Sequence, residues 1–323
     1  MIKRLLVGFA VTLMIVPAAL ACGPASGVAN GMPIPPAANS IMKIKVDQLV
    51  NNPELKAAYE QLAKGHSGWP QTADAALTQV LTKTGIDLST TSSAVFFADV
   101  ESGSDQQNMY AGVIATGSFK QSAVIESVQS AAKQTLNTSN YKGFTVYASA
   151  QDKYEIAFLS SSQFVAGSAK AVRDTLDVSK GDQKALTGSV IDTLDRFGGA
   201  AIAAASAPPE ALRSQAEKQI PQQSPVSLAA FQNIDTIGFS LDPQGLTVNA
   251  RVDAHFTNAT SVTDAKDAIT GLISLAKGTT QDSNLKAALS SIQVSTSGQW
   301  LTVRDTFNPS EIASLAGSLQ PKK

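Results

Sequence analysis

The chain has 323 residues, a formal net charge of −1, a hydrophobic content of 43% and an aromatic content of 6%. A near-neutral chain lacks the basic patch by which proteins bind nucleic acid or anionic lipid surfaces, so the composition argues against both partners. Because the sequence holds a single cysteine, disulfides within the chain are excluded. Its stability must therefore come from a packed core, built largely of Ala, Val, Ile and Leu.

The N-terminal residues have the layout of an export signal. Lys3 and Arg4 give a basic start, an uncharged run follows from Leu5 to Ala21, and small residues end that run just before Cys22. This order is typical of a secretory signal peptide rather than of a transmembrane helix. No later stretch has the length of uncharged apolar sequence that a spanning helix needs, so we expect no second membrane crossing.

Two interpretations of the cleavage point remain open. Ala19-Leu20-Ala21 fits an ordinary Ala-x-Ala cleavage site, after which the protein would be secreted. The same residues followed by Cys22 resemble the lipobox of bacterial lipoproteins, which more often has Leu where Ala19 stands. The only cysteine lies at this boundary, where lipid attachment would explain an otherwise unpaired thiol. The resemblance implies removal of residues 1–21, an acyl group such as palmitate on Cys22, and a location in the cell membrane or outer membrane, facing outside the cytoplasm.

The expected mature chain begins with a linker. Residues 22–40 are uncharged and rich in Gly and Pro, which predicts a flexible tether after the anchor. About 300 residues remain after the signal, enough for one large core or two domains. The order of the predicted elements divides the body into a first α+β unit at 41–185, which includes N-terminal helices, and a second unit at 186–323.

Hydrophobic periodicity and end signals predict the elements of the first unit. Ser168 is the expected N-cap of the last helix of this unit. The predicted helices span 47–64 with a break at Pro53, 73–84, 120–136 and 168–178, and the predicted strands span 93–100, 109–117, 143–149, 154–159 and 163–166.

In the second unit, Pro243 and Gly245 predict a type I turn between two long strands. The strand after this turn alternates apolar and polar residues, which predicts a sheet with one wet face. The predicted helices span 190–196, 209–220, 260–277, 284–290 and 309–319, and the predicted strands span 199–206, 234–241, 246–256, 292–296 and 299–307.

Residues 93–180 and 234–319 share the order hairpin, long amphipathic helix, hairpin and terminal helix, although few residues are identical. The predicted fold is therefore α+β: a duplicated unit of antiparallel hairpins with amphipathic helices packed on one sheet face.

Three short segments carry a further resemblance: Thr84–Asp87, Tyr141–Tyr147 and Val165–Val178. They resemble a diffuse group of exported prokaryotic proteins of unknown function over roughly residues 41–320. The shared motifs are helix ends, turns and caps, so the resemblance implies a fold and no activity.

The sequence offers little for metal binding. His66 and His255 are the only histidines and lie far apart, so a zinc site of His and Cys ligands is not expected. Asp99, Glu101 and Asp105 lie close together in an acidic stretch that lacks the spacing of an EF-hand. A solvated hairpin loop explains these carboxylates better than a calcium site.

Candidate nucleophiles also lack their partners. Gly65–Gly68 is one residue short of the Gly-x-Ser-x-Gly elbow of hydrolases. Ser130 with Lys133 and Ser283 with Lys286 match Ser-x-x-Lys, but the accompanying Ser-Asp-Asn and Lys-Thr-Gly motifs are missing. A serine hydrolase is therefore disfavoured, and both pairs are expected on solvated helix faces.

The remaining motifs do not indicate a functional site either. Asp174 with Asp177 and Asp264 with Asp267 have basic neighbours and are expected on solvated, charged helix faces. No Gly-x-Gly-x-x-Gly or Walker loop supports nucleotide binding. The sequence thus predicts no catalytic residue, no metal site and no cofactor, and Cys22 is the one expected site.

These observations lead to three hypotheses on function. The first is a non-enzymatic exported lipoprotein that binds another macromolecule or has a structural role in the cell envelope, with the membrane as its partner through the anchor. The alternative is a carrier or sensor of an apolar ligand such as a lipid, with a cavity lined by strand 200–205 and helix 260–277. The third, a transporter's solute-binding protein, lacks its alternating βαβ pattern.

Overall fold

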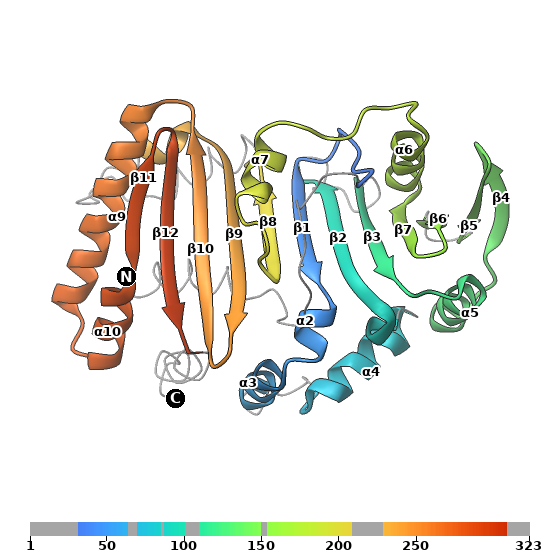
Figure 1. Cartoon of the computed structure of the whole chain (residues 1–323), viewed down its shortest axis with the longest axis horizontal. Coiled ribbons are helices and arrows are strands. Elements are labelled where there is room, and N and C mark those ends of the chain that lie inside the picture. The colour runs from blue at the N-terminus through green and yellow to red at the C-terminus, as the bar shows by residue number, and fades with distance from the viewer. Residues whose placement is uncertain are drawn as a thin grey trace.

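The computed structural model describes residues 32–63, 70–84, 87–100, 110–149, 154–208 and 229–308. Over these ranges the chain forms one antiparallel sheet of 12 strands in the order β11-β12-β10-β9-β8-β1-β2-β3-β7-β6-β5-β4 (Figure 1). The strands are β1 Ser40–Lys45, β2 Thr91–Asp99, β3 Tyr110–Gly117, β4 Asn137–Tyr141, β5 Phe144–Ala148, β6 Tyr154–Ser160, β7 Gln163–Ser168, β8 Ile202–Ser206, β9 Ile234–Gln244, β10 Thr247–Phe256, β11 Gln293–Ser297 and β12 Trp300–Phe307.

The helices are mostly short, and the longest follows the β9–β10 hairpin. They are α2 Asp47–Val50, α3 Pro53–Ala63, α4 Ala73–Thr84, α5 Gln121–Ala132, α6 Ala169–Lys180, α7 Ser189–Asp195, α9 Ala259–Thr279 and α10 Ser283–Ser291, with two 3-10 turns at η1 Leu88–Thr90 and η3 Ala229–Asn233. Within the described ranges, no helix combines the length and apolar character needed to cross a membrane. The fold is α+β, as the sequence predicts.

The sheet repeats one arrangement in its two halves. The order β1-β2-β3-β7-β6 in the first half matches β8-β9-β10-β12-β11 in the second, and β1 pairs with β8 where the halves meet. A helix follows the β2–β3 hairpin as α5 and the β9–β10 hairpin as α9. The duplicated unit of the prediction therefore builds one continuous sheet, extended at one end by β4 and β5. The expected boundary at 185/186 stays a prediction.

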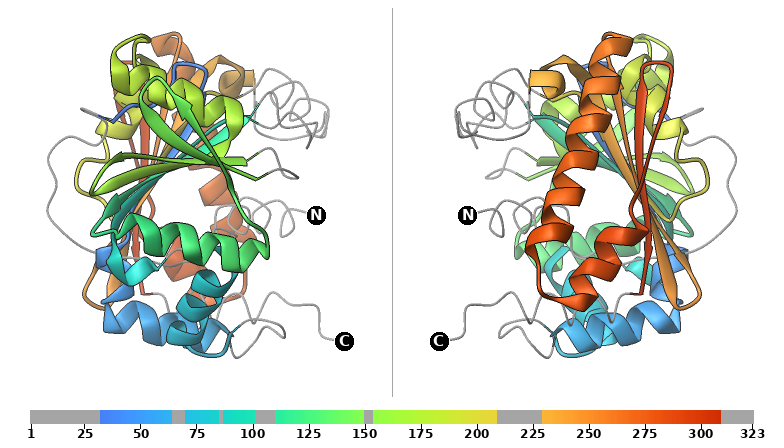
Figure 2. Two further views of the ribbon diagram at one scale, coloured as in Figure 1. Left: turned by 90° about the vertical axis from the view of Figure 1, so that its right-hand side faces the viewer. Right: turned by 90° about the vertical axis from the view of Figure 1, so that its left-hand side faces the viewer.

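Helices pack on both faces of this sheet, whereas the sequence predicts one covered face. Helices α2 to α5 and α9 pack on one face, named here the α9 face, and α10 packs against α9 (Figure 2). Helices α6 and α7 pack on the opposite face, named here the α7 face. The cause is that central strands place apolar side chains on both faces, as Phe96 and Phe97 do in β2.

Most predicted helix bounds agree with the structure, but the sequence pattern does not predict one central strand. The break at Pro53 separates α2 from α3, and α4 spans the predicted residues 73–84. Strand β1 lies in the middle of the sheet, although two of its residues, Lys43 and Lys45, carry charges. These charged residues interrupt the apolar pattern that is typical of a central strand, so the sequence predicts no strand at residues 40–45.

One local prediction was wrong, and another was confirmed only in position. The β9–β10 turn lies at Gly245 and Leu246, because Gln244 pairs with Thr247 and Pro243 is already part of β9. Gly245 has a φ of +60°, which suits glycine at this turn. Ser168 occupies the N-cap of α6 but makes no capping bond; its hydroxyl accepts a hydrogen bond from the Ala111 backbone N–H at 3.4 Å.

Residues 32–40 of the expected tether belong to the folded body rather than to a linker. Ile34 and Ala38 are buried on the α7 face, and the Ile34 carbonyl accepts a 2.8 Å hydrogen bond from the Leu186 N–H. Pro and Gly made this stretch resemble a linker, but its apolar side chains join the core. Cys22, the signal at 1–21 and the predicted helices at 209–220 and 309–319 lie outside the described residues.

Candidate functional site

One row of side chains on the α9 face is apolar across ten neighbouring strands. Each member pairs with the next in the strand register. We call this set the apolar row; its members are Ile156, Ala166, Val113, Phe96, Met42, Ala204, Phe239, Val252, Val303 and Val294. Strands lie about 4.8 Å apart, so the row extends for about 43 Å. An unbroken line of this length requires every strand to contribute an apolar residue in one register.

Phe96, near the middle of the apolar row, is its exposed member, whereas Ile156 is buried and the other members are half-buried. Helix α9 packs over the β10–β12 end, and α5 packs over β3, β6 and β7 at the other end. The helix with the main contacts to β1, β8 and β9 is α7, which lies on the opposite face. Phe96 is 41% exposed, and Met42, Ala204 and Phe239 are half-buried.

The side chains in this middle stretch suit an adaptable apolar surface. Ala204 is small and lies between Met42 and Phe239 in the register, which leaves a low point between larger neighbours. Methionine is flexible and fills irregular apolar space. Exposed large apolar side chains are typical of binding surfaces, and Phe96 has this character, with the half-buried Met42 next to it in the register.

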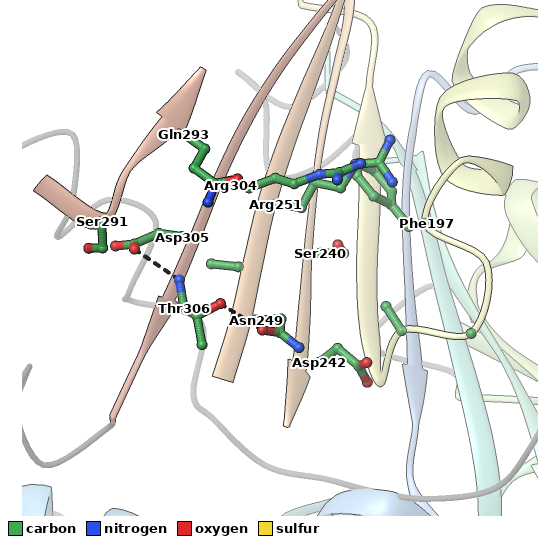
Figure 3. A pocket seen from close by; sticks show the side chains of 13 residues that line it. Phe197, Ser240, Asp242, Asn249, Arg251, Ser291, Gln293, Arg304, Asp305 and Thr306 are labelled. Carbon is green, nitrogen blue, oxygen red and sulfur yellow. Dashed lines mark hydrogen bonds between the residues drawn. The ribbon is translucent and has the colours of Figure 1, made fainter. Parts of the chain in front are cut away.

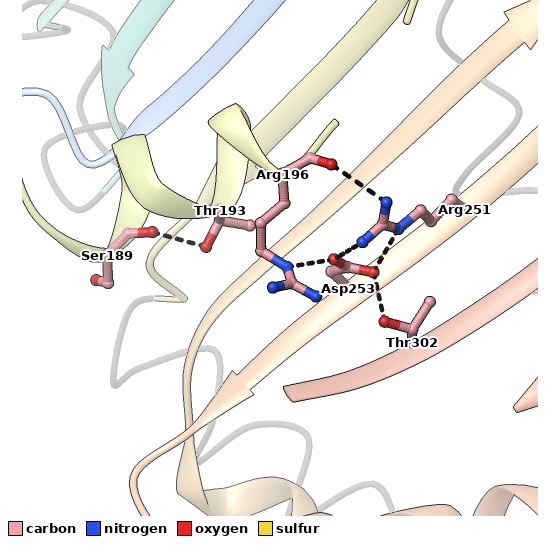
Figure 4. A network of polar contacts seen from close by, with 6 residues as sticks. All are labelled: Ser189, Thr193, Arg196, Arg251, Asp253 and Thr302. Atoms are coloured by element: carbon pink, nitrogen blue, oxygen red, sulfur yellow. Dashed lines mark hydrogen bonds and ion pairs between the residues drawn. The ribbon is translucent and has the colours of Figure 1, made fainter. Parts of the chain in front are cut away.

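The same strands present charged residues on the α7 face. The Asp253 carboxylate, with no exposed surface, accepts hydrogen bonds from Arg196 Nε at 2.6 Å and from Arg251 Nε and Nη2 at 2.8 and 2.6 Å (Figure 4). Thr302 Oγ1 donates a further bond at 2.9 Å. The network joins the end of α7 to β10 and β12, so one buried carboxylate holds two arginines in place.

Burial and hydrogen bonding act in opposite directions on Asp253. Burial alone raises the pKa of this carboxyl, but the bonds from Arg251, Arg196 and Thr302 outweigh it and hold the pKa below its ordinary value. Asp253 is therefore ionised in the folded protein near neutral pH.

His255 belongs to the same side of β10. Its Nδ1 lies 2.8 Å from Asp235 Oδ1, and its ring lies 4.6 Å from the Trp300 ring. The Arg196 guanidinium carbon lies 4.0 Å from the Trp300 ring centre. The expected wet face is thus packed around β10, because α7 and its arginine cover it.

Two lysines of β1 add positive charge beneath α7. Lys45 donates to the Gly199 carbonyl and Lys43 is buried beside it. Burial and the neighbouring Lys45 lower the pKa of Lys43, while Asp195 acts in the opposite direction. These two lysines add positive charge to the α7 face where the two halves of the sheet meet.

A groove of about 690 Å³ opens on the α7 face beside this network (Figure 3). Its volume falls in the range of small-molecule sites, roughly 300–1,000 Å³. The groove is lined by the loop after α7 and by residues of β9 to β12: Phe197, Gly199, Ala200, Ser240, Asp242, Asn249, Ala250, Arg251, Ser291, Gln293, Arg304, Asp305 and Thr306.

The residues that the sequence singled out are not brought together. Ser130 and Lys133 are exposed on α5 and its C-cap, and Ser283 and Lys286 are exposed on α10. Within the described ranges, no group of His, Cys, Asp and Glu has a metal-binding arrangement. His66, Gly65–Gly68, Glu101 and Asp105 lie outside those ranges.

One carboxylate pair differs from its prediction. Asp174 accepts a 3.0 Å bond from the Tyr110 hydroxyl, and Asp177 accepts a 3.1 Å bond from the Tyr141 hydroxyl. Burial and the Asp174 carboxylate raise the pKa of Tyr110. These aspartates fasten α6 to the strands rather than forming a free solvated face, whereas Asp264 and Asp267 are exposed on α9 as expected.

Comparison with known proteins gives a likeness of fold alone. Three crystal structures of TP0453 resemble the chain: form III has a TM-score of 0.48 at 11% identity, form I 0.47 at 12%, and form IV 0.48 at 10%. The alignments cover 88%, 91% and 87% of this chain and 96%, 98% and 96% of the respective TP0453 chains. No family model matches the chain, and no curated protein matches it.

Proposed function

We propose that the chain is an exported, non-enzymatic protein, anchored by a lipid on Cys22, which binds an acyl chain of a membrane lipid along its apolar row. The observation that carries the proposal is the unbroken register of the row, with Phe96 41% exposed at its middle. The anchor and the non-enzymatic character rest on the sequence. The proposal places the protein at the cell membrane or outer membrane, outside the cytoplasm.

The dimensions of the row support an acyl chain as its occupant. From Phe96 to Phe239 the row crosses β2, β1, β8 and β9, three strand spacings or about 14 Å. The hydrocarbon core of a bilayer is about 30 Å thick, so one leaflet's chains extend about 15 Å. A single acyl chain therefore matches the length of the row from Phe96 to Phe239, and the anchor would hold this surface near its source.

Binding of a fluorescent stearate tests the proposal. The sample is the mature chain from residue 22 carrying Cys22→Ser, which removes the protein's own acyl group. We expect Phe96→Glu to weaken stearate binding by about tenfold or more, because a carboxylate placed in the row disfavours an apolar occupant. Leu246→Glu is the matched control, since Leu246 is 69% exposed at the β9–β10 turn and lies outside the row. It should leave the affinity unchanged.

Two outcomes would overturn the proposal. One is the absence of stearate binding, or equal binding by the wild type and Phe96→Glu. The other is a concentration-dependent dimer of the wild type that Phe96→Glu dissociates and stearate does not affect. In that case the apolar row is an interface between two copies of the chain.

The anchor has its own test. The wild type expressed in a bacterial host should fractionate with membranes and yield an N-terminal peptide that carries the acyl mass on Cys22. Cys22→Ser should appear in the soluble exported fraction, because in this proposal the acyl group on Cys22 holds the chain to the membrane. An unmodified Cys22 at the mature N-terminus of the wild type would contradict the lipoprotein interpretation.

A further inference from the structure

The groove on the α7 face contains a pair of like charges that no carboxylate separates. Arg304 of β12 is registered directly opposite Arg251 of β10, and like charges opposite each other in a sheet repel. Figure 3 shows both side chains extending toward Phe197. Arg251 is engaged by Asp253, but Arg304 has no carboxylate partner in the part of the chain that the structure describes.

Positive charge exceeds negative charge at this end of the groove. Arg196 and Arg251 share the single carboxylate of Asp253, so that carboxylate balances only one of them. Lys45 donates to the carbonyl of Gly199, a lining residue, and so places a further cation at the wall.

The two lining carboxylates do not compensate the arginines. Asp305 accepts a 2.9 Å bond from the Thr306 N–H, and its side chain points away from the arginine pair toward Ser291 in Figure 3. Asp242 accepts from Gln244 Nε2 at 2.9 Å and lies at the other end of the groove. The arginine end is therefore open to an external anion.

A serine of β9 adds a hydroxyl to the arginine end of the groove. Ser240 lies next to Arg251 in the register and lines the groove, yet it is only 6% exposed. A serine hydroxyl both donates and accepts hydrogen bonds, so Ser240 offers one to an occupant of the groove.

We propose that the groove binds a small phosphate-bearing anion, held by the guanidinium of Arg304 with support from Arg251 and by the Ser240 hydroxyl. Arginine presents a planar fork of donors that matches phosphate oxygens. The volume of about 690 Å³ exceeds what one phosphate group needs, so the ligand carries an organic part. Glycerol phosphate, free or as the headgroup of a phospholipid, has this chemistry, and the site lies on the sheet face opposite the apolar row.

Calorimetric titration of the mature Cys22→Ser chain with sn-glycerol 3-phosphate at low salt tests the free form of the ligand. A parallel flotation assay with phosphatidylglycerol vesicles, and phosphatidylcholine vesicles for comparison, tests the headgroup form. In each assay that detects binding, Arg304→Glu should weaken it by about tenfold or more, and Ser240→Ala should weaken it by a smaller factor. Lys286→Glu makes the same charge change at an exposed site on α10 and should leave binding unchanged.

Binding of glycerol 3-phosphate that depends on Arg304 supports a site for a free metabolite. Binding of phosphatidylglycerol vesicles alone, with the same dependence, supports a headgroup site. No binding in either assay overturns the proposal, as does binding that Arg304→Glu and Lys286→Glu weaken equally, since that result reflects net charge rather than the groove.

Discussion

Asp253→Ala should lower the free energy of unfolding by about 3 to 5 kcal/mol, the usual loss when one partner of a buried ion pair is removed. Asp253 has no exposed side-chain surface and is the carboxylate that Arg196 and Arg251 share, while Thr302 donates to it as well. Its removal leaves two partly buried guanidinium groups without their counter-charge. Urea denaturation followed by circular dichroism measures the change.

Asp264→Ala is the control for this variant, because Asp264 is exposed on α9. It should change the unfolding free energy by no more than about 0.5 kcal/mol. A loss for Asp253→Ala as small as that of the control would show that the network contributes little to the fold.

The pKa of Asp253 predicts how this stabilisation depends on pH. Because the folded-state pKa is lowered, the contribution is fully present above the unfolded-state value of about 3.9. It is lost as the pH falls through the folded-state pKa. The wild type should therefore lose stability more steeply than Asp253→Ala below about pH 4, and parallel curves would argue against the assigned shift.

Phe97→Ala should destabilise the protein by about 3 to 5 kcal/mol, the range for a buried phenylalanine. Phe97 is 1% exposed, and its ring packs so closely on Gly112 that a Cβ added there would lie 2.4 Å from Phe97 Cζ. The Tyr110 ring lies 6.4 Å away, edge to face. Phe96, the neighbour on the α9 face, is 41% exposed, and Phe96→Ala should cost about 1 kcal/mol.

The two phenylalanines thus form a matched pair with opposite expectations. Phe97→Ala should affect urea denaturation strongly, while Phe96→Ala should affect stearate binding and leave the fold largely intact. Equal destabilisation by both variants would mean that Phe96 is a core residue. The proposal that the apolar row is a binding surface would then be contradicted.

The sequence predicted the α+β class and the repeated order of elements because these depend on local periodicity. It missed β1, because Lys43 and Lys45 interrupt the apolar pattern of a strand that lies at the centre of the sheet. Their burial depends on residues far along the chain, such as Gly199, whose carbonyl accepts from Lys45. It also missed β4, whose residues 137–141 include no aliphatic side chain.

The candidate site was harder to predict than the fold. The apolar row needs the register of ten strands, and no single stretch of sequence contains more than one or two of its members. Arg251 and Asp253 were visible as alternate residues of a strand, but their partner Arg196 is 57 positions from Asp253. The alternation of apolar and polar residues in this strand predicted that both lie on a solvent-exposed face. The position of α7, which the sequence pattern does not predict, shows that this face is covered.

The structure changes the ranking of the functional hypotheses. From sequence alone, a macromolecular binding or envelope-structural role came first, since it required no cavity. The apolar row now favours the acyl-binding alternative. Strand β8 supplies Ala204 to the row, whereas α9 packs over β10 to β12, and β9 lies between these strands and β8. A cavity lined by both segments stays a prediction.

Native mass spectrometry of the protein, gently extracted from its own membrane, tests the central claim most directly. Our account predicts a mature chain with an acylated Cys22 and one additional, non-covalently bound apolar molecule, which Phe96→Glu retains much less. A wild-type spectrum that shows the acylated chain without any bound molecule, extracted under conditions that preserve its fold, would contradict the proposal that the apolar row binds lipid.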